Sequence, residues 1–159
     1  MQSMNGWPPE EAEFYGEALA LLAAAQDTLT ARVELIRRAE MERTGRDPVE
    51  HVKTRIKKAQ SMREKLIRRG FAPSAEAALR WVHDAVGVRV VCSFLEDVYR
   101  IAEQLRQQEA WTVLGEKDYI HRPKPNGYRS YHMIVQLPVS AAGDIRQVYG
   151  EVHVRTLAM

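Results

Sequence analysis

The segment from Lys117 to Val135 constrains this chain most, because it combines two prolines, an Asn-Gly turn and a strand-like pattern. Pro123 and Pro125 fix the backbone φ angle, and Gly127 accepts a positive φ without steric cost. We therefore expect a pinned loop that leads into a β-strand. Cations and aromatic rings alternate along the loop, a combination that suits a ligand with phosphates and a flat base. A solvated hairpin turn is the alternative that this segment leaves open.

Basic residues gather ahead of this loop. The formal net charge is only +2, yet eight Lys or Arg lie between residues 51 and 69. A local basic patch in a nearly neutral chain indicates a phosphate-bearing ligand more than a DNA-coating surface. On a predicted helix from Lys57 to Arg69, steps of three and four residues place one set of side chains on one face. That set is Lys57, Ser61, Lys65 and Arg68 or Arg69. A solvated charged face is the competing interpretation.

Cysteine usage and hydropathy exclude several classes of protein. Cys92 is the single cysteine, so the sequence contains neither a disulfide framework nor a zinc-binding cysteine spacing. No apolar run approaches membrane-spanning length, and the N-terminal residues are acidic rather than signal-like. We expect a soluble, cytoplasmic chain whose 159 residues fold as one domain with a genuine core.

Hydrophobic periodicity predicts helices and strands in the order ααβααβαβββ. The first helical stretch runs from about Pro8 to Met41, and Gly16 softens or breaks it. Ser93 and Glu96 fit a capping box for the helix that follows the strand from Asp84 to Phe94. The other predicted elements are strands 49–56, 111–113, 131–139 and 145–156 and helices 57–69 and 73–82. This order favours an α/β or α+β domain with one mixed sheet and covering helices.

Two carboxylates stand out within this pattern. Asp84 lies at the entry to a strand, and Glu151 shares one face of the last strand with His153 and Arg155. Carboxylates that project from adjacent strands are a common way to hold Mg²⁺. Arg89 lies within an apolar strand, where it needs an anionic or polar partner. With the basic helix and the aromatic loop, these residues predict a phosphoryl-transfer site, although either carboxylate alone is more often a surface or salt-bridge carboxylate.

Four segments together resemble the synthetase domain of the RelA/SpoT family, and most of all its single-domain members, the small alarmone synthetases. The segments are Arg55-x-Lys57-x-x-x-Ser61-x-x-x-Lys65, HDAVGVRVVCSF, EKDYIHRPKPNGYRSYH and EVHVRTLAM. The GYRSYH motif within them is highly specific. The resemblance implies a nucleotidyltransferase-like α+β fold with a mixed, mainly antiparallel sheet of about five strands. It also implies a division into an N-terminal helical segment, 1–47, and a synthetase domain, 48–159.

The resemblance further implies a pyrophosphokinase. Such enzymes move the β,γ-diphosphate of ATP onto the 3′-hydroxyl of GDP or GTP, which gives ppGpp or pppGpp and AMP. Asp84 and Glu151 would hold Mg²⁺, and Glu151 would also activate the 3′-hydroxyl. The implied ATP-binding residues are Arg55, Lys57, Ser61, Lys65, Arg69 and Arg89, with the guanidinium groups of Arg55 and Arg89 flanking the adenine. The implied acceptor-nucleotide residues are Lys124, Asn126, Tyr128, His132 and His153, with Tyr128 stacking on the guanine.

Two departures from the family pattern keep alternatives open. His153 stands where the family usually has Gln. The family also continues its RTLAM segment with helices that pack beside the acceptor site and build a homo-tetramer, and this sequence lacks them. The alternatives are a nucleotide-binding module without activity, and a toxin-like relative that pyrophosphorylates tRNA or adenine nucleotides. The sequence does not indicate a preference between GDP and GTP.

Overall fold

The computed structural model describes residues 6–141 and 143–159, and its elements follow the predicted order ααβααβαβββ. The helices are α1 (Pro9–Tyr15), α2 (Ala18–Thr44), α3 (Ala59–Arg68), α4 (Ala75–Trp81) and α5 (Leu95–Arg106). The strands are β1 (Val49–Ile56), β2 (Val86–Cys92), β3 (Thr112–Asp118), β4 (Tyr131–Ala141) and β5 (Asp144–Thr156).

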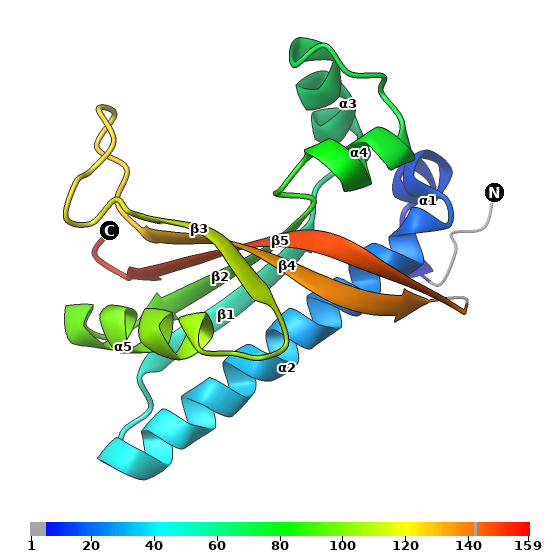
Figure 1. Cartoon of the computed structure of the whole chain (residues 1–159). Helices are drawn as coiled ribbons and strands as arrows, with labels where there is room; N and C mark the ends of the chain where they lie inside the picture. Colours follow the sequence, from blue (N-terminus) through cyan, green and yellow to red (C-terminus); the bar gives the residue numbers. More distant parts are fainter. Residues whose placement is uncertain (1–5, 142) are drawn as a thin grey trace.

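The strands form one sheet in the order β1-β2-β5-β4-β3. Only β2 and β5 pair in parallel among these strands, and the other three pairs are antiparallel. The predicted mixed, mainly antiparallel α+β fold is therefore confirmed. Figure 1 shows α2 and α5 along one face of the sheet, whereas α3, α4 and the loop between β3 and β4 rise at opposite ends of the other face. The middle of that second face is left open.

Helix α2 supplies much of the core beneath the sheet. Its buried stripe includes Leu22, Leu29 and Val33, as the helical spacing predicted. The approach to β5 is close, because a Cβ atom added to Gly150 would lie 2.9 Å from Cδ1 of Leu29. The proposed boundary between 1–47 and 48–159 falls in the connection from α2 to β1, although α2 shares one hydrophobic core with the sheet. The division stays a prediction.

The structure places the starts of two helices differently from the sequence prediction. Helix α3 begins at Ala59 rather than Lys57, because the Lys57 amide still donates to the Ala85 carbonyl at 2.8 Å, as an extension of the sheet. The Ser93–Glu96 capping box is wrong by one residue. The Phe94 amide donates to Oδ2 of Asp97 at 3.1 Å instead, while Ser93 Oγ donates to Glu50. None of the described helices is long and apolar enough to cross a membrane.

A buried carboxylate joins the two helices beneath the sheet. Glu40 of α2 accepts from Nε of Arg43 at 2.8 Å and from Nη2 of Arg100 on α5 at 3.0 Å. Burial opposes ionisation, but hydrogen bonds from Arg100 and Arg43 outweigh it and hold the pKa of Glu40 below its ordinary value of 4.5. An acid with a lowered folded-state pKa stabilises the protein above its unfolded pKa, and this contribution is lost as pH falls through the folded value.

We therefore expect Glu40→Gln to lower the free energy of unfolding at pH 7 by about 1–2 kcal/mol. The expected loss is kept small because both arginine partners are partly exposed, where solvent weakens the ion pairs. Urea unfolding at a series of pH values measures this loss. The difference from wild type is expected to narrow as pH falls below 4.5. A difference that stays constant through that range would contradict the assignment.

Candidate active site

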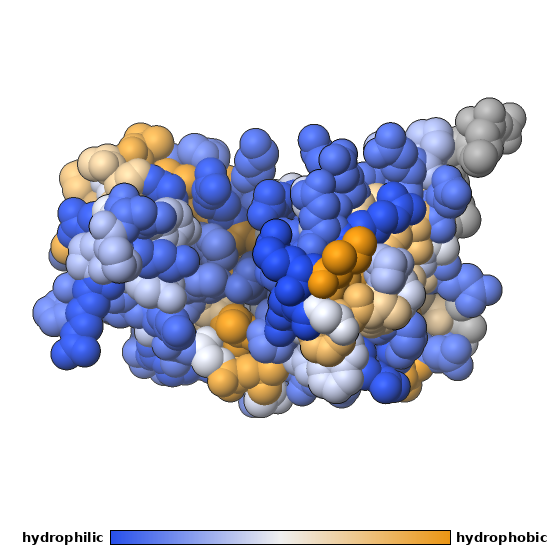
Figure 2. All heavy atoms as spheres, turned by 90° about the horizontal axis from the view of Figure 1, so that it is seen from above, coloured by the Kyte–Doolittle hydropathy of each residue, from blue (hydrophilic) through white to orange (hydrophobic). Residues whose placement is uncertain are grey.

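A pocket of about 180 Å³ lies on the open face of the sheet, over β1, β2 and β5. Figure 2 shows the molecule from above, with hydrophilic side chains around a hollow near its middle. Five of the sequence-predicted site residues line this pocket: Arg55, Asp84, Arg89, Glu151 and His153. The lining also includes four residues that sequence reasoning did not single out: Lys53, Thr54, Gly87 and Val88. The alternating pattern of β1 was the available signal for Lys53, because it places Lys53 and Arg55 on the same face.

Strand register explains why residues distant in sequence meet here. Lys53 pairs with Arg89, Arg89 with His153, and His153 with His132, so a row of basic side chains crosses four strands. Lys117 on β3 extends the row, because it pairs with His132. Paired residues project to the same side of a sheet. The open face therefore carries a row of Lys, Arg and His side chains, in which the charges of Lys53, Arg89 and Lys117 favour anionic ligands.

Asp84 lies at one edge of the pocket and is held by two lysines. Lys57 Nζ lies 3.0 Å from Oδ2 of Asp84, and Lys65 Nζ lies 2.9 Å from Oδ1. Burial alone would raise the pKa of the Asp84 carboxyl, but the hydrogen bonds from Lys65 and Lys57 lower it below its usual value. Asp84 thus offsets the mutual repulsion of two cations, Lys57 before α3 and Lys65 on α3.

Of the six predicted ATP-binding residues, Arg55 and Arg89 line the pocket. Lys57 and Lys65 contact its lining residue Asp84, and Ser61 and Arg69 do not line it. Ser61 is exposed on α3. Arg69, just after α3, donates through Nη1 to the Trp81 carbonyl at 3.3 Å, and its guanidinium lies 5.6 Å from the centre of the Phe71 ring. Its side chain therefore contacts α4 and the α3–α4 connection. Ligand roles for Ser61 and Arg69 stay predictions.

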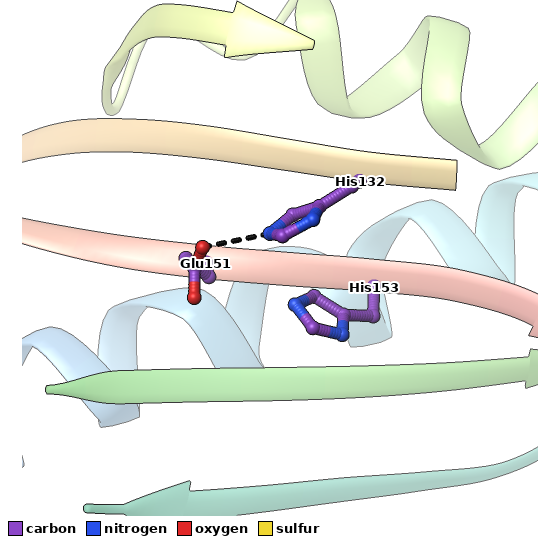
Figure 3. Close-up of side chains that lie close together, drawn as sticks. All are labelled: His132, Glu151 and His153. Atoms are coloured by element: carbon purple, nitrogen blue, oxygen red, sulfur yellow. Dashed lines mark hydrogen bonds and ion pairs between the residues drawn. The ribbon is translucent and has the colours of Figure 1, made fainter. Parts of the chain in front are cut away.

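Glu151 belongs to a hydrogen-bonded group of side chains on β4 and β5. His132 Nε2 lies 2.7 Å from Glu151 Oε1, and the rings of His132 and His153 are 4.1 Å apart (Figure 3). Burial raises the pKa of Glu151, but the hydrogen bond from His132, together with the electrostatic influence of His132 and His153, outweighs burial and leaves this pKa below its ordinary value. Burial, reinforced by His132, lowers the pKa of His153 to about 4. At neutral pH the group thus presents an ionised carboxylate beside a neutral imidazole.

Hydrogen bonds within the loop between β3 and β4 hold it in one conformation, as expected. Asn126 Oδ1 accepts from the Tyr128 amide at 3.0 Å, and Gly127 adopts a positive φ of 84°. Asn126 therefore shapes the turn in this structure. Lys124 Nζ lies 4.8 Å from the centre of the Tyr119 ring and 5.3 Å from that of Tyr128. Tyr128 in turn reaches the pocket, because its hydroxyl lies 3.2 Å from His153 Nδ1.

Two α1 residues that sequence reasoning missed support the lysine side of the pocket. The Tyr15 hydroxyl donates to the Lys57 carbonyl, and Glu11 Oε1 accepts from the Ala59 amide at 3.1 Å. Burial strongly raises the pKa of Tyr15, which stays protonated and keeps its donor. These contacts fix the turn between β1 and α3, from which Lys57 projects. Nothing in the α1 sequence distinguishes Tyr15 and Glu11 from ordinary amphipathic positions.

We expect Tyr15→Phe to raise the KM for the nucleotide predicted to bind at Lys57 by about fivefold, with kcat changed less, because one buried hydrogen bond is worth about 1 kcal/mol. Steady-state kinetics measures both parameters. Glu13→Gln, which changes an exposed side chain of the same helix, is the matched control. Equal KM values for wild type and Tyr15→Phe would exclude the supporting role.

Two carboxylates in this pocket suit a divalent cation. Asp84 and Glu151 both line it, and the negative charge of Asp84 works against the overall lowering of the Glu151 pKa. A cation between carboxylate oxygens would remove that repulsion. The donor set therefore fits a metal that prefers oxygen ligands.

Residues 54–159 match the family described as a region found in RelA / SpoT proteins. A GTP pyrophosphokinase of Bacillus subtilis (strain 168), YwaC, is 36% identical over 147 residues, which are 92% of this chain and 70% of that protein. The crystal structure of small alarmone synthetase 2 from Bacillus subtilis superposes with a TM-score of 0.77 at 37% identity, and covers 89% of this chain and 72% of that one. Small alarmone synthetase 1 from the same organism, bound to its product pppGpp, gives a TM-score of 0.79 at 30% identity over 89% of this chain and 71% of that one.

Proposed function

This chain belongs to the RelA/SpoT family, and on that premise we propose that it is a small alarmone synthetase acting as a GTP pyrophosphokinase. The reaction moves the β,γ-diphosphate of ATP to the 3′-hydroxyl of GDP or GTP and releases AMP. One observation carries the proposal: Asp84 and Glu151 share a pocket whose other charged side chains are cationic. That arrangement suits a polyphosphate, a divalent cation and a hydroxyl to be activated.

The donor nucleotide is proposed to bind at the β1, β2 and α3 side. Arg55 and Arg89 would flank the adenine, because guanidinium planes stack well on flat rings. Lys57 and Lys65, now paired with Asp84, would transfer their hydrogen bonds to the phosphates. The amines of Lys57 and Lys65 bind different oxygens of the Asp84 carboxylate, so their spacing suits two neighbouring phosphate oxygens. Positive charge held there would stabilise the negative charge that develops during transfer.

The acceptor nucleotide is proposed to bind at the β4, β5 and loop side. Tyr128 would stack on the guanine, and Lys124 beside it would meet a phosphate. Glu151 would accept the proton of the 3′-hydroxyl, and His132 would hold the carboxylate in place through its 2.7 Å hydrogen bond. His153 is held by the Tyr128 hydroxyl and would line the sugar end of this site.

The family requires a divalent metal, and we propose Mg²⁺ held by Asp84 and Glu151. Bound there, Mg²⁺ would neutralise phosphate charge in the transition state. We also propose that the chain works in the cytoplasm, where its nucleotide substrates are available. The homo-tetramer implied by the resemblance stays a prediction.

Incubation of the purified chain with γ-labelled ATP, Mg²⁺ and a single acceptor tests the proposal. GDP, GTP, ATP and deacylated tRNA would be supplied in separate reactions and the products resolved by chromatography. The proposal predicts label in ppGpp or pppGpp and names the preferred acceptor. Label on tRNA or an adenine nucleotide would assign the chain to the toxin-like branch. ATP binding without transfer to any acceptor would contradict the proposed activity.

A further inference from the structure

Three side chains with metal-binding atoms converge on the open face of the sheet. They are His132 of β4 and Glu151 and His153 of β5, and one ligand atom from each lies within 4.8 Å of the other two. Figure 3 shows the three side chains close together, with His132 projecting from β4 toward Glu151 on β5. Register accounts for this, because His132 pairs directly with His153 and Glu151 lies two residues earlier on the same face. A rigid antiparallel pair thus fixes all three positions.

The spacing is close to what a small cation requires. An ion bound tetrahedrally at about 2.1 Å keeps its ligand atoms roughly 3.4 Å apart. His132 Nε2 and Glu151 Oε1 lie 2.7 Å apart, and all three ligand atoms fall within 4.8 Å. To bind such an ion, His132 Nε2 and Glu151 Oε1 have to move slightly apart, and the more widely separated ligand atoms have to move slightly closer together. Side-chain rotation achieves this without movement of the strands.

A second layer of hydrogen bonds orients one of the imidazoles. His153 Nδ1 lies 3.2 Å from the Tyr128 hydroxyl, which accepts from Ser130 Oγ at 3.0 Å. Occupation of Nδ1 by Tyr128 leaves Nε2 of His153 as the metal-binding nitrogen. Histidines that bind metals usually have their second ring nitrogen held in this way.

We propose that His132, Glu151 and His153 form a binding site for a borderline divalent cation, of which Zn²⁺ is the type. Two imidazole nitrogens and one carboxylate oxygen are a donor set that zinc accepts, with a fourth position left for water or substrate. Mg²⁺ prefers oxygen ligands and gives up its water reluctantly, so the two histidines discriminate against it. His153 stands where the family usually has Gln, and this His-Glu-His set depends on it.

Occupation of this site has a consequence that rests on the proposed function. The cation would bind the carboxylate of Glu151, which then could not accept the proton of the acceptor hydroxyl. It would also displace the His132–Glu151 hydrogen bond. Because the proposed Mg²⁺ site also uses Glu151, Zn²⁺ held by the two histidines would compete with Mg²⁺ for this carboxylate and inhibit diphosphate transfer.

Metal binding is tested on the whole, chelator-stripped chain without nucleotide. Zn²⁺ is titrated in competition with a chromophoric chelator, and Co²⁺ is used as an absorbing substitute. The wild type is expected to bind one Zn²⁺ tightly and to give the intense Co²⁺ bands of a low-coordinate nitrogen and oxygen site. His153→Gln is expected to bind at least about tenfold more weakly. His51→Gln, which removes an exposed histidine of β1 outside the cluster, is expected to match the wild type.

Equal Zn²⁺ affinity in wild type and His153→Gln would overturn the site, as would a weak Co²⁺ spectrum typical of six oxygen ligands. Circular dichroism checks that the variant is folded, and His132→Gln provides a second ligand deletion with the same expected loss. Zn²⁺ binding through His153 in a chain that transfers no diphosphate would overturn the proposed function while supporting the metal site. The two failures are therefore distinguishable.

Discussion

Replacement of Glu151 by Gln is expected to lower kcat for diphosphate transfer by about 10²–10⁴-fold, the usual worth of a positioned proton acceptor. The amide keeps the size of the side chain, and its oxygen can still accept from His132 Nε2. It cannot take up a proton. ATP affinity is expected to equal or exceed that of the wild type, since the change removes a negative charge from a pocket lined with cations. Steady-state kinetics and equilibrium ATP binding measure the two effects separately.

Glu50→Gln is the matched control for this change. Glu50 is an exposed residue of β1 that accepts from Ser93 Oγ at 2.9 Å, and it does not line the pocket. Its replacement is expected to leave kcat at the wild-type value. Retention of more than about a tenth of wild-type kcat in Glu151→Gln would rule out Glu151 as the proton acceptor.

Asp84→Asn is expected to lower both activity and stability. The oxygen of the Asn side chain can accept from one lysine, but its NH₂ group cannot accept from the other. One of Lys57 and Lys65 therefore loses its partner. Because these side chains are mostly buried, we expect a loss of about 1–3 kcal/mol in the free energy of unfolding. Loss of the carboxylate proposed to hold the metal is expected to lower kcat by about 10²-fold or more. Denaturant unfolding and transfer assays measure the two losses.

Asp47→Asn separates these two effects. Asp47 also forms a strong ion pair, because Oδ2 lies 2.6 Å from Nη2 of Arg37, but this pair links α2 to β1 outside the pocket. We expect Asp47→Asn to destabilise the fold and to leave kcat per folded molecule unchanged. If both variants lose stability and neither loses activity, Asp84 is a structural residue only.

The order of elements and the sheet were predictable because local patterns and tertiary packing agree in this chain. The alternation in β5 placed Glu151 and His153 on one face, and the spacing in α2 placed Leu22 and Leu29 in the core. Gly16 was expected to soften or break the first helix, and it separates α1 from α2. In these segments each local preference matches the global fold.

The remaining features depend on contacts that sequence periodicity does not encode. Pairing of both Lys57 and Lys65 with Asp84 requires α3 and the start of β2 to be placed together. The support from Tyr15 depends on α1 packing against the turn after β1. Arg69 shared the helical spacing of Lys65, yet it lies after the end of α3 and contacts α4. Spacing along a helix identifies which residues share a face, but it does not identify the elements that this face contacts.

The central claim is that a diphosphate moves as one unit from ATP to a guanosine nucleotide. Its most direct test quantifies AMP and 3′-diphosphorylated guanosine nucleotide in one reaction, with ATP labelled at the β and γ phosphates. The account predicts equal amounts of the two products, with both labelled phosphates in the guanosine product. ADP in place of AMP, or γ label released as inorganic phosphate, would contradict it.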